Sequence, residues 1–229
     1  MSEKKDWILI WLFVCFVVTA LFPTWATGES ADLKLTKIQN EVMVKTSKST
    51  TWKKAVLNMA LVKGDKVRTG KNSFATLTFS YPGENCFQLY ENTEIAVSEL
   101  MKGEKGYLKK AGIDMLKGGT WSKLKKVDGE GLDFQLKTPN TVAAISGTAL
   151  ATIVYSDKET YFCACDGVID IGHPGAQVKI KRCQGTSVVG SDPPLAPVSD
   201  KYIITDKKYS QDPRYSWCMH CHSAMEKAK

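Results

Sequence analysis

The carboxyl-terminal end of the chain holds the residues whose spacing most directly indicates a chemistry. Residues 217–222 are Trp-Cys-Met-His-Cys-His, so Cys218, Cys221 and His222 form the pattern C-x-x-C-H. This pattern is the attachment site of c-type haem. Two thiols at this spacing can bond both vinyl groups of the porphyrin, and the histidine that follows then lies beneath the iron as an axial ligand. The sequence therefore predicts one covalent haem c held by Cys218, Cys221 and His222.

The opposite axial position of that iron has few candidates, because the chain contains only 3 histidines. His220 lies between the two attached cysteines, and this short loop should keep it from the other face of its own haem. Met225 follows His222 closely and should also stay on the proximal side. We therefore expect the sixth ligand to be His173 or a residue supplied by a partner protein.

Two alternatives to haem remain open for this tail. The two thiols and a histidine could instead hold zinc, since cysteine and histidine are its usual ligands. They could also act as a redox-active dithiol or disulfide.

The amino terminus has the features of an export signal. Lys4 and Lys5 precede an uncharged apolar run over residues 7–22, and Thr24–Ala26 offers small residues to a signal peptidase. This run is shorter than the ~20 residues that cross a bilayer, so residues 1–26 are expected to be a cleaved signal peptide. An uncleaved membrane anchor is the alternative. In either case we expect the rest of the chain in the periplasm, the cell envelope or the extracellular space.

Composition and charge narrow the class of protein further. The chain has 229 residues, of which 43% are hydrophobic and 24% are charged, which excludes a wholly disordered, collagen-like or coiled-coil protein. The net charge is +7. In an exported protein this charge suits anionic envelope surfaces or acidic proteins, so we expect no nucleic-acid partner. The lysine-rich segment 102–126 is expected to be a solvated face, with a docking patch as the alternative.

Four cysteines lie between the two ends of the chain, and they are Cys86, Cys163, Cys165 and Cys183. An even number in an exported domain favours two disulfides, with three possible connectivities. Cys163 and Cys165 are two apart on an expected strand and point the same way, so they are poorly placed to bond each other. A hairpin centred near residue 174 would place Cys165 opposite Cys183, which leaves Cys86 for Cys163. A metal site built from these thiols and His173 is the alternative.

Between residues 31 and 190 the sequence repeatedly alternates apolar and polar residues, as half-buried strands do. The runs are Leu33–Leu35, Val42–Val44, Ala75–Phe79, Phe87–Leu89, Ile95–Val97, Phe134–Leu136, Ile153–Tyr155, Val168–Ile171 and Val178–Ile180. Turn signals occur at Gly64-Asp65, Tyr81–Gly83, Lys117–Gly119, Asp128-Gly129 and Gly172–Gly175. This pattern predicts an all-β fold, either a sandwich or an elongated wrapped sheet.

The composition changes after residue 190 and indicates a domain boundary. All 17 glycines precede residue 191, whereas residues 191–197 contain three prolines. We therefore expect a β domain over residues 31–190, a semi-rigid proline-rich linker over 191–200 and a haem-binding tail over 201–229.

Several blocks of the β region share a further pattern. They are Trp52–Ala55, Leu61–Gly70, Ser73–Phe79, Leu89–Glu94, Leu116–Gly118 with Trp121, Phe134, Thr138-Pro139, Val142, Ile145–Thr148 and Asp166–Val168. With these blocks, about residues 38–185 resemble the FecR domain family. The resemblance implies a multi-stranded β fold, but no single function, because the family includes regulators of iron-uptake sigma factors and exported domains without an assigned activity.

The regulators in that family have a cytoplasmic amino-terminal segment that engages a sigma factor. Only six residues precede the apolar run here, so we expect no interaction with a sigma factor. In the β region, Trp52 and Trp121 are expected to be core aromatic residues. The region contains no Ser/His/Asp arrangement, no paired carboxylates at catalytic spacing and no phosphate-binding loop, so we do not expect an enzyme.

The sequence thus predicts an exported FecR-like protein that carries one haem c and passes single electrons to an envelope redox or signalling protein. The alternative is a non-redox binding or sensory module whose tail binds a metal or forms a disulfide.

Overall fold

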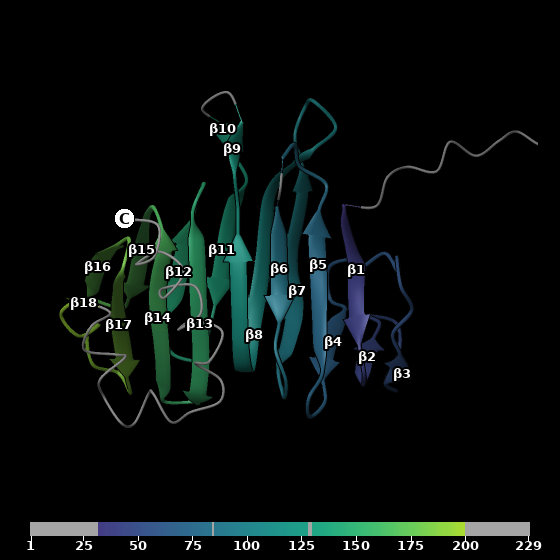
Figure 1. Ribbon diagram of the computed structural model, residues 1–229, viewed down its shortest axis with the longest axis horizontal. Helices are drawn as coiled ribbons and strands as arrows, with labels where there is room; N and C mark the ends of the chain where they lie inside the picture. Colours follow the sequence, from purple (N-terminus) through teal and green to yellow (C-terminus); the bar gives the residue numbers. More distant parts are fainter. Residues whose placement is uncertain (1–31, 84, 128–129, 200–229) are drawn as a thin grey trace, which may run out of the picture. The chain divides into compact units, whose positions relative to one another are not determined.

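The computed structural model of the chain describes residues 32–83, 85–127 and 130–199, which form strands and turns without a helix (Figure 1). This confirms the predicted all-β fold. In this part of the chain there is accordingly no helix that could cross a membrane. The expected signal or anchor over residues 1–26 and the expected haem-binding tail over residues 201–229 lie outside the described residues.

The strands form two layers that share one long strand, β8 (Leu108–Lys123). Layer 1 has the order β1 (Leu33–Gln39), β5 (Phe74–Phe79), β6 (Cys86–Leu89), β8, β13 (Ala149–Ser156), β14 (Glu159–Asp166), β17 (Gln184–Val189) and β18 (Val198–Ser199). Layer 2 has the order β3 (Lys53–Lys54), β2 (Val42–Lys45), β4 (Lys66–Thr69), β7 (Glu94–Lys102), β8, β11 (Asp133–Lys137), β12 (Val142–Ile145), β15 (Val168–His173) and β16 (Ala176–Lys181). A small separate hairpin consists of β9 (Lys126–Val127) and β10 (Glu130–Gly131).

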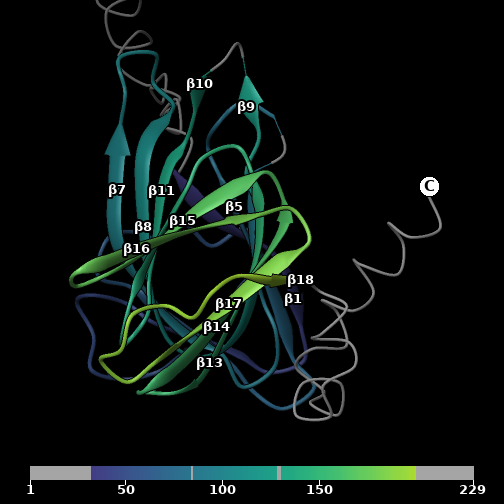
Figure 2. The same ribbon diagram turned by 90° about the vertical axis from the view of Figure 1, so that its left-hand side faces the viewer.

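The two layers face each other across one hydrophobic core. Figure 2 shows β7, β8 and β11 on one side and β13, β14 and β17 on the other. Alternate residues of each strand point into the core, as the period of two requires. In the middle of the core Phe134 packs against Phe79 and Phe87, with ring centroids 5.4 and 5.7 Å away. Burial of these rings contributes about 1.5–3 kcal/mol each to folding.

Strand β8 passes from one layer to the other at Gly118. The amino-terminal part of β8 pairs with β7 and β11, and its last residues pair with β6 and β13. At the change of layer, Gly118 has a φ of +96°, and a Cβ atom there would lie only 2.5 Å from the Cα of Thr93. Only glycine fits this conformation and this space. The prediction of a turn at Lys117–Gly119 is therefore wrong, because these glycines bend a continuous strand.

A second crossing between the layers is made by a long hairpin. Strands β15 and β16 form its tip in layer 2, turning at Pro174-Gly175, and β14 and β17 form its base in layer 1. The two sides of the hairpin change layer at Gly167 and Cys183, whose φ values are +74° and +62°. The tip of this hairpin carries His173 to one end of the sandwich.

The alternating runs were good predictors of strands. Each of the predicted runs lies inside an observed strand. The turns predicted at Gly64-Asp65, Tyr81–Gly83 and Gly172–Gly175 are also confirmed, whereas Asp128-Gly129 lies outside the described residues. The alternating runs did not predict the other described strands, which are β3, β4, β8, β9, β10, β12, β14, β17 and β18.

The proline-rich segment after residue 190 is attached to the sandwich where it is described. The N–H of Leu195 donates to the carbonyl of Ser187, and the hydroxyl of Thr186 donates to the carbonyl of Leu195. Further along, β18 pairs with β17. The predicted linker thus lies along the edge of layer 1 as far as residue 199.

Candidate functional site

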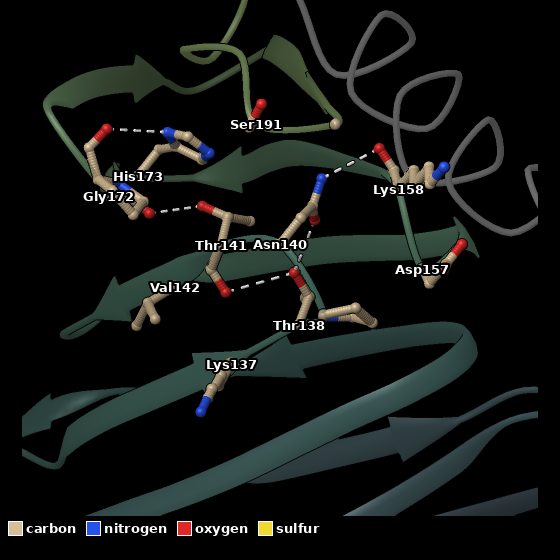
Figure 3. Close-up of a pocket in the computed structure, with 13 residues that line it drawn as sticks. Lys137, Thr138, Asn140, Thr141, Val142, Asp157, Lys158, Gly172, His173 and Ser191 are labelled. Carbon is tan, nitrogen blue, oxygen red and sulfur yellow. Dashed lines mark hydrogen bonds between the residues drawn. The ribbon is translucent and has the colours of Figure 1, made fainter.

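One end of the sandwich contains a cleft of about 880 Å³ that is lined mostly by polar and charged residue types, and we call it the polar cleft (Figure 3). Four connections between strands meet there, and they contribute Lys137–Val142, Asp157-Lys158, Gly172–Pro174 and Gly190-Ser191. These connections come from both layers. The cleft volume lies within the range of about 300–1,000 Å³ that is typical of small-molecule and cofactor sites.

Hydrogen bonds hold the walls of this cleft in place. Asn140 donates to the backbone carbonyls of Lys158 and Val188 at 3.2 and 3.0 Å, and its side-chain oxygen accepts from Thr160 at 2.7 Å. The hydroxyl of Thr141 donates to the carbonyl of Gly172. Asn140 and Thr141 therefore join the β11–β12 turn to both arms of the long hairpin, so the cleft is a defined feature of the fold.

His173 is the only histidine in the described part of the chain, and it lies in the wall of this cleft (Figure 3). Its Nδ1 is 3.2 Å from the carbonyl oxygen of Pro174. Because a carbonyl can only accept, Nδ1 must carry the hydrogen, and Nε2 of the neutral ring then holds the lone pair. A backbone carbonyl that fixes the ring in this way is the usual outer contact of a metal-bound histidine.

The charge of the cleft is mainly positive. Lys137 and Lys158 lie in its wall with a single carboxylate, Asp157, and the remaining lining residues are uncharged. Within the described residues, no group of three or more His, Cys, Asp or Glu side chains could hold a metal ion. The cleft can therefore offer one imidazole ligand to a metal that is already held elsewhere, together with cations for an anionic group.

The alternative of a metal site formed by His173 with the four central cysteines is wrong for the described residues. His173 lies at the tip of the long hairpin, whereas Cys165 and Cys183 lie at its base, several residue pairs away along the ladder. The thiol of Cys165 is free in the structure and lies 3.9 Å from the carbonyl oxygen of Cys163.

The structure also tests the predicted disulfide pairs. The ladder between β14 and β17 ends with Ala164 opposite Gln184, and Cys183 lies just beyond it in a turn, where its N–H donates to the carbonyl of Ala164. The hairpin therefore brings Cys183 close to the strand of Cys165, whereas a bond between these two cysteines stays a prediction. The pairing of Cys86 with Cys163 is wrong: β8 and β13 lie between their strands, so the two residues are at least about 14 Å apart. A disulfide needs Cα atoms within about 7 Å.

Both predicted core tryptophans are only half-buried. Trp52 lies on the surface, where the guanidinium of Arg68 and the amine of Lys45 lie 4.4 and 5.7 Å from its ring centroid. Trp121 points away from the main core and packs on a second cluster on the outer face of layer 1. The prediction that Trp52 and Trp121 are core residues is therefore wrong, because both rings cover surfaces outside the main core.

The lysine-rich segment 102–126 is partly neutralised by acids from other parts of the chain. Lys102 pairs with Asp32 at 3.5 Å, and Lys110 pairs with Glu99 at 3.1 Å. Partly exposed ion pairs such as these contribute little to stability. They fit the expectation of a solvated face, and they could not be recognised from the local sequence because the partner acids lie outside the segment.

The remaining predicted site residues are Cys218, Cys221 and His222, with His220 and Met225 beside them. All of them lie outside the described residues, so the haem assignment stays a prediction.

Comparison with known proteins bears on the β region. Residues 65–170 match the family described as FecR protein. The match begins just before β4 and ends within β15, so it is shorter than the region of resemblance expected from the sequence. No curated protein matches the chain.

Two solved structures are similar to the chain, both of a proposed anti-sigma factor from Parabacteroides distasonis ATCC 8503, at 1.65 and 2.50 Å resolution. Each has 11% sequence identity and a TM-score of 0.48, and the alignment covers 61% of this chain. The chain spans 62% of the length of those proteins.

The FecR match includes only part of the polar cleft. Lys137–Val142 and Asp157-Lys158 lie within it, whereas Gly172–Pro174 and Gly190-Ser191 follow it. The side of the cleft that carries His173 is therefore supplied by the chain beyond the matched FecR region.

Proposed function

We propose that this protein is an exported electron-transfer protein in which a FecR-like sandwich supports one haem c, attached to the carboxyl-terminal segment. The observation that carries the proposal is the C-x-x-C-H motif formed by Cys218, Cys221 and His222. The haem would supply one-electron chemistry. The chain would supply two thioether bonds, a proximal imidazole and a protein surface against which the haem is partly shielded from water.

The polar cleft supports His173 as the sixth ligand. The Nδ1–H of His173 is occupied by the carbonyl of Pro174, which leaves Nε2 as the nitrogen able to bind iron. Lys137 and Lys158 are suitable partners for the two haem propionates. Eighteen residues lie between Ser199 and Cys218, enough for up to about 60 Å of extended chain, so the length of the segment permits a return to the cleft.

The test is expression of the full chain in a bacterium with an intact system for cytochrome c maturation. We expect the purified protein to be red, to show the absorption bands of a low-spin haem and to gain the mass of one haem. Replacement of both Cys218 and Cys221 by alanine should remove the covalent haem, and His222→Ala should change its spectrum. A colourless wild-type protein, or a His222→Ala spectrum equal to the wild type, would contradict the proposal.

The sixth ligand has its own test, with His220→Ala as the matched control. We expect His173→Ala to convert the low-spin spectrum to a high-spin one and to shift the reduction potential, while His220→Ala leaves both unchanged. If neither variant changes the spectrum, the ligand comes from a partner protein or from another copy of this chain.

A second candidate is favoured by the FecR match over residues 65–170. In this case the sandwich would act as an envelope signalling module, and the tail would hold zinc or a disulfide. Because regulatory members of the family bind a sigma factor, this second candidate includes a sigma-factor partner. From the sequence we expected no such partner. Stoichiometric zinc in a colourless protein would favour this second candidate over the haem protein.

A further inference from the structure

The outer face of layer 1 carries a second apolar cluster, separate from the main core. It contains Ala149, Ala151, Ile153, Tyr161, Cys163 and Cys165, with Trp121 and Tyr155 packed against it, and we call it the outer cluster. Residues that alternate with it on β13 and β14, such as Leu150, Val154 and Phe162, belong to the main core. Strands β13 and β14 therefore have an apolar side chain on both faces, a pattern that is typical of strands covered on both sides.

The outer cluster is a continuous apolar surface, which we call the trough. Trp121, Ala151, Cys163 and Gly185 are direct neighbours in the register of β8, β13, β14 and β17, so they form one row across the sheet. Small residues lie in the middle of the trough, and the larger rings of Trp121, Tyr155 and Tyr161 lie around them.

This trough is covered, although the described strands provide no second layer over it. Its six central residues are between 0 and 6% exposed. Within the described part of the chain, every member of the cluster comes from β8, β13 or β14, which lie side by side in a single layer. An apolar sheet face with so little exposure needs a covering element, because the side chains of one flat face cannot shield each other from water.

The position at which the described chain ends indicates which segment covers the trough. Strand β18 pairs with β17 at the edge of layer 1, and 30 further residues follow it. Crossing from β18 to β13 requires three strand spacings, about 14 Å, which five extended residues can span. The segment also has suitable side chains for a trough of this kind, namely Tyr202, Ile203, Ile204, Tyr209, Tyr215 and Trp217.

We propose that residues 200–229 dock on the outer cluster of layer 1 as an integral third layer of the sandwich. The docking is driven by burial of apolar surface at about 25 cal/mol per Å² and does not require haem. It differs from the expectation of a separate haem-binding tail that follows a semi-rigid linker. If the segment also carries haem, the docking determines where the motif is held relative to the sandwich.

The experiment compares two variants of the full chain, Ala151→Arg in the trough and Leu116→Arg on an exposed part of β8 as the matched control. Leu116 is 42% exposed, so an arginine is tolerated there. The readouts are the rate of tryptic cleavage after Lys207, Lys208 and Arg214, and the rate at which iodoacetamide labels Cys165 in the folded protein. Haem content is measured in each sample, so that a protein without haem but with a protected segment refutes only the proposed function.

We expect Ala151→Arg to raise both rates at least tenfold, because the charged side chain displaces the segment, while Leu116→Arg behaves like the wild type. Unchanged cleavage of the segment in Ala151→Arg would overturn the proposal. If the same variant instead converts a dimer to a monomer in gel filtration, the covering element is a second copy of the chain.

A second variant, with substitutions in the covering segment instead of the trough, tests the proposal if Ala151→Arg fails to fold. Replacing Ile203 and Ile204 by glutamate leaves the sandwich itself intact, and its far-UV circular dichroism should stay that of the wild type. Labelling of Cys165 should again rise at least tenfold. Protection of Cys165 equal to the wild type in this folded variant would overturn the proposal.

Discussion

The two halves of the sandwich, on either side of β8, are built differently. In the amino-terminal half, strands such as β4, β5 and β6 alternate strictly between buried and partly exposed residues, so only one face of the sheet is covered. In the carboxyl-terminal half, β13 and β14 have six consecutive buried residues each. The first half follows the pattern of a sheet that faces solvent, whereas the second follows the pattern of a sheet between two layers.

The two halves also differ in where the candidate binding features lie. The polar cleft with His173 and the outer cluster both belong to the carboxyl-terminal half. A smaller cleft of about 400 Å³ in the same half is lined by Lys123, Lys125, Lys126 and Arg182, next to Cys165. The half that departs from simple alternation is therefore the half in which binding features are concentrated, and the amino-terminal half provides the support.

The prediction with the largest expected loss of stability tests whether the two halves share one core. Phe134 is fully buried and packs against Phe79 and Phe87 from the amino-terminal half. We expect Phe134→Ala to lower the free energy of unfolding by about 3–5 kcal/mol, because it leaves a large cavity. Urea unfolding followed by circular dichroism and by tryptophan fluorescence should give coincident transitions. Two separate transitions would show that the halves fold independently.

The prediction with the next largest loss of stability compares the outer faces of the two halves. Ile153 in the outer cluster is 1% exposed, although it points away from the main core. We expect Ile153→Ala to lower the free energy of unfolding by about 2–4 kcal/mol, the cost of a buried position. On the outer face of the amino-terminal half, Thr76→Ala should cost less than about 0.5 kcal/mol. Equal effects of the two substitutions in urea unfolding would remove the distinction between the halves.

The same contrast explains how much of the fold could be predicted from the sequence. Alternation predicted β1, β2, β5, β6 and β7, because each of these strands has one covered face. Strand β14 has the sequence Glu-Thr-Tyr-Phe-Cys-Ala-Cys-Asp, in which apolar residues follow one another, so no period of two is visible. Strand β8 was missed for another reason, since its lysines and paired glycines are typical of turns and solvated segments.

The candidate site was predictable only in part. His173 and the hairpin that begins after Cys165 and returns to Cys183 followed from local signals, a lone histidine and a turn sequence. The separation of Cys86 from Cys163 depends on strand order, which a single sequence does not contain. The walls of the cleft could not be predicted, because they join four connections that are far apart in the chain.

A third prediction concerns β8, the strand that joins the halves. Gly118 has a φ of +96° and is in close contact with Thr93. We expect Gly118→Ala to lower the free energy of unfolding by about 1–3 kcal/mol, through backbone strain and the displacement of Thr93. Gly106→Ala is the control for strain alone, because Gly106 also has a positive φ but has no atom within 4 Å of its Cβ position. If both variants lose the same stability, close packing at the crossing is unimportant.

The smallest expected effect concerns the outer surface of the amino-terminal half, where a cation–π contact takes the place of an apolar cluster. The guanidinium of Arg68 lies 4.4 Å from the ring centroid of Trp52, and Trp52 is half-buried. We expect a coupling energy of about 0.5–1 kcal/mol between these two side chains. The measurement is a double-mutant cycle of Arg68→Ala and Trp52→Leu in urea unfolding, with Lys63→Ala in place of the arginine variant as the control. The Lys63 cycle should show no coupling. A coupling above about 2 kcal/mol for Arg68 and Trp52 would indicate a desolvated contact, and this half would then have a covered outer face as well.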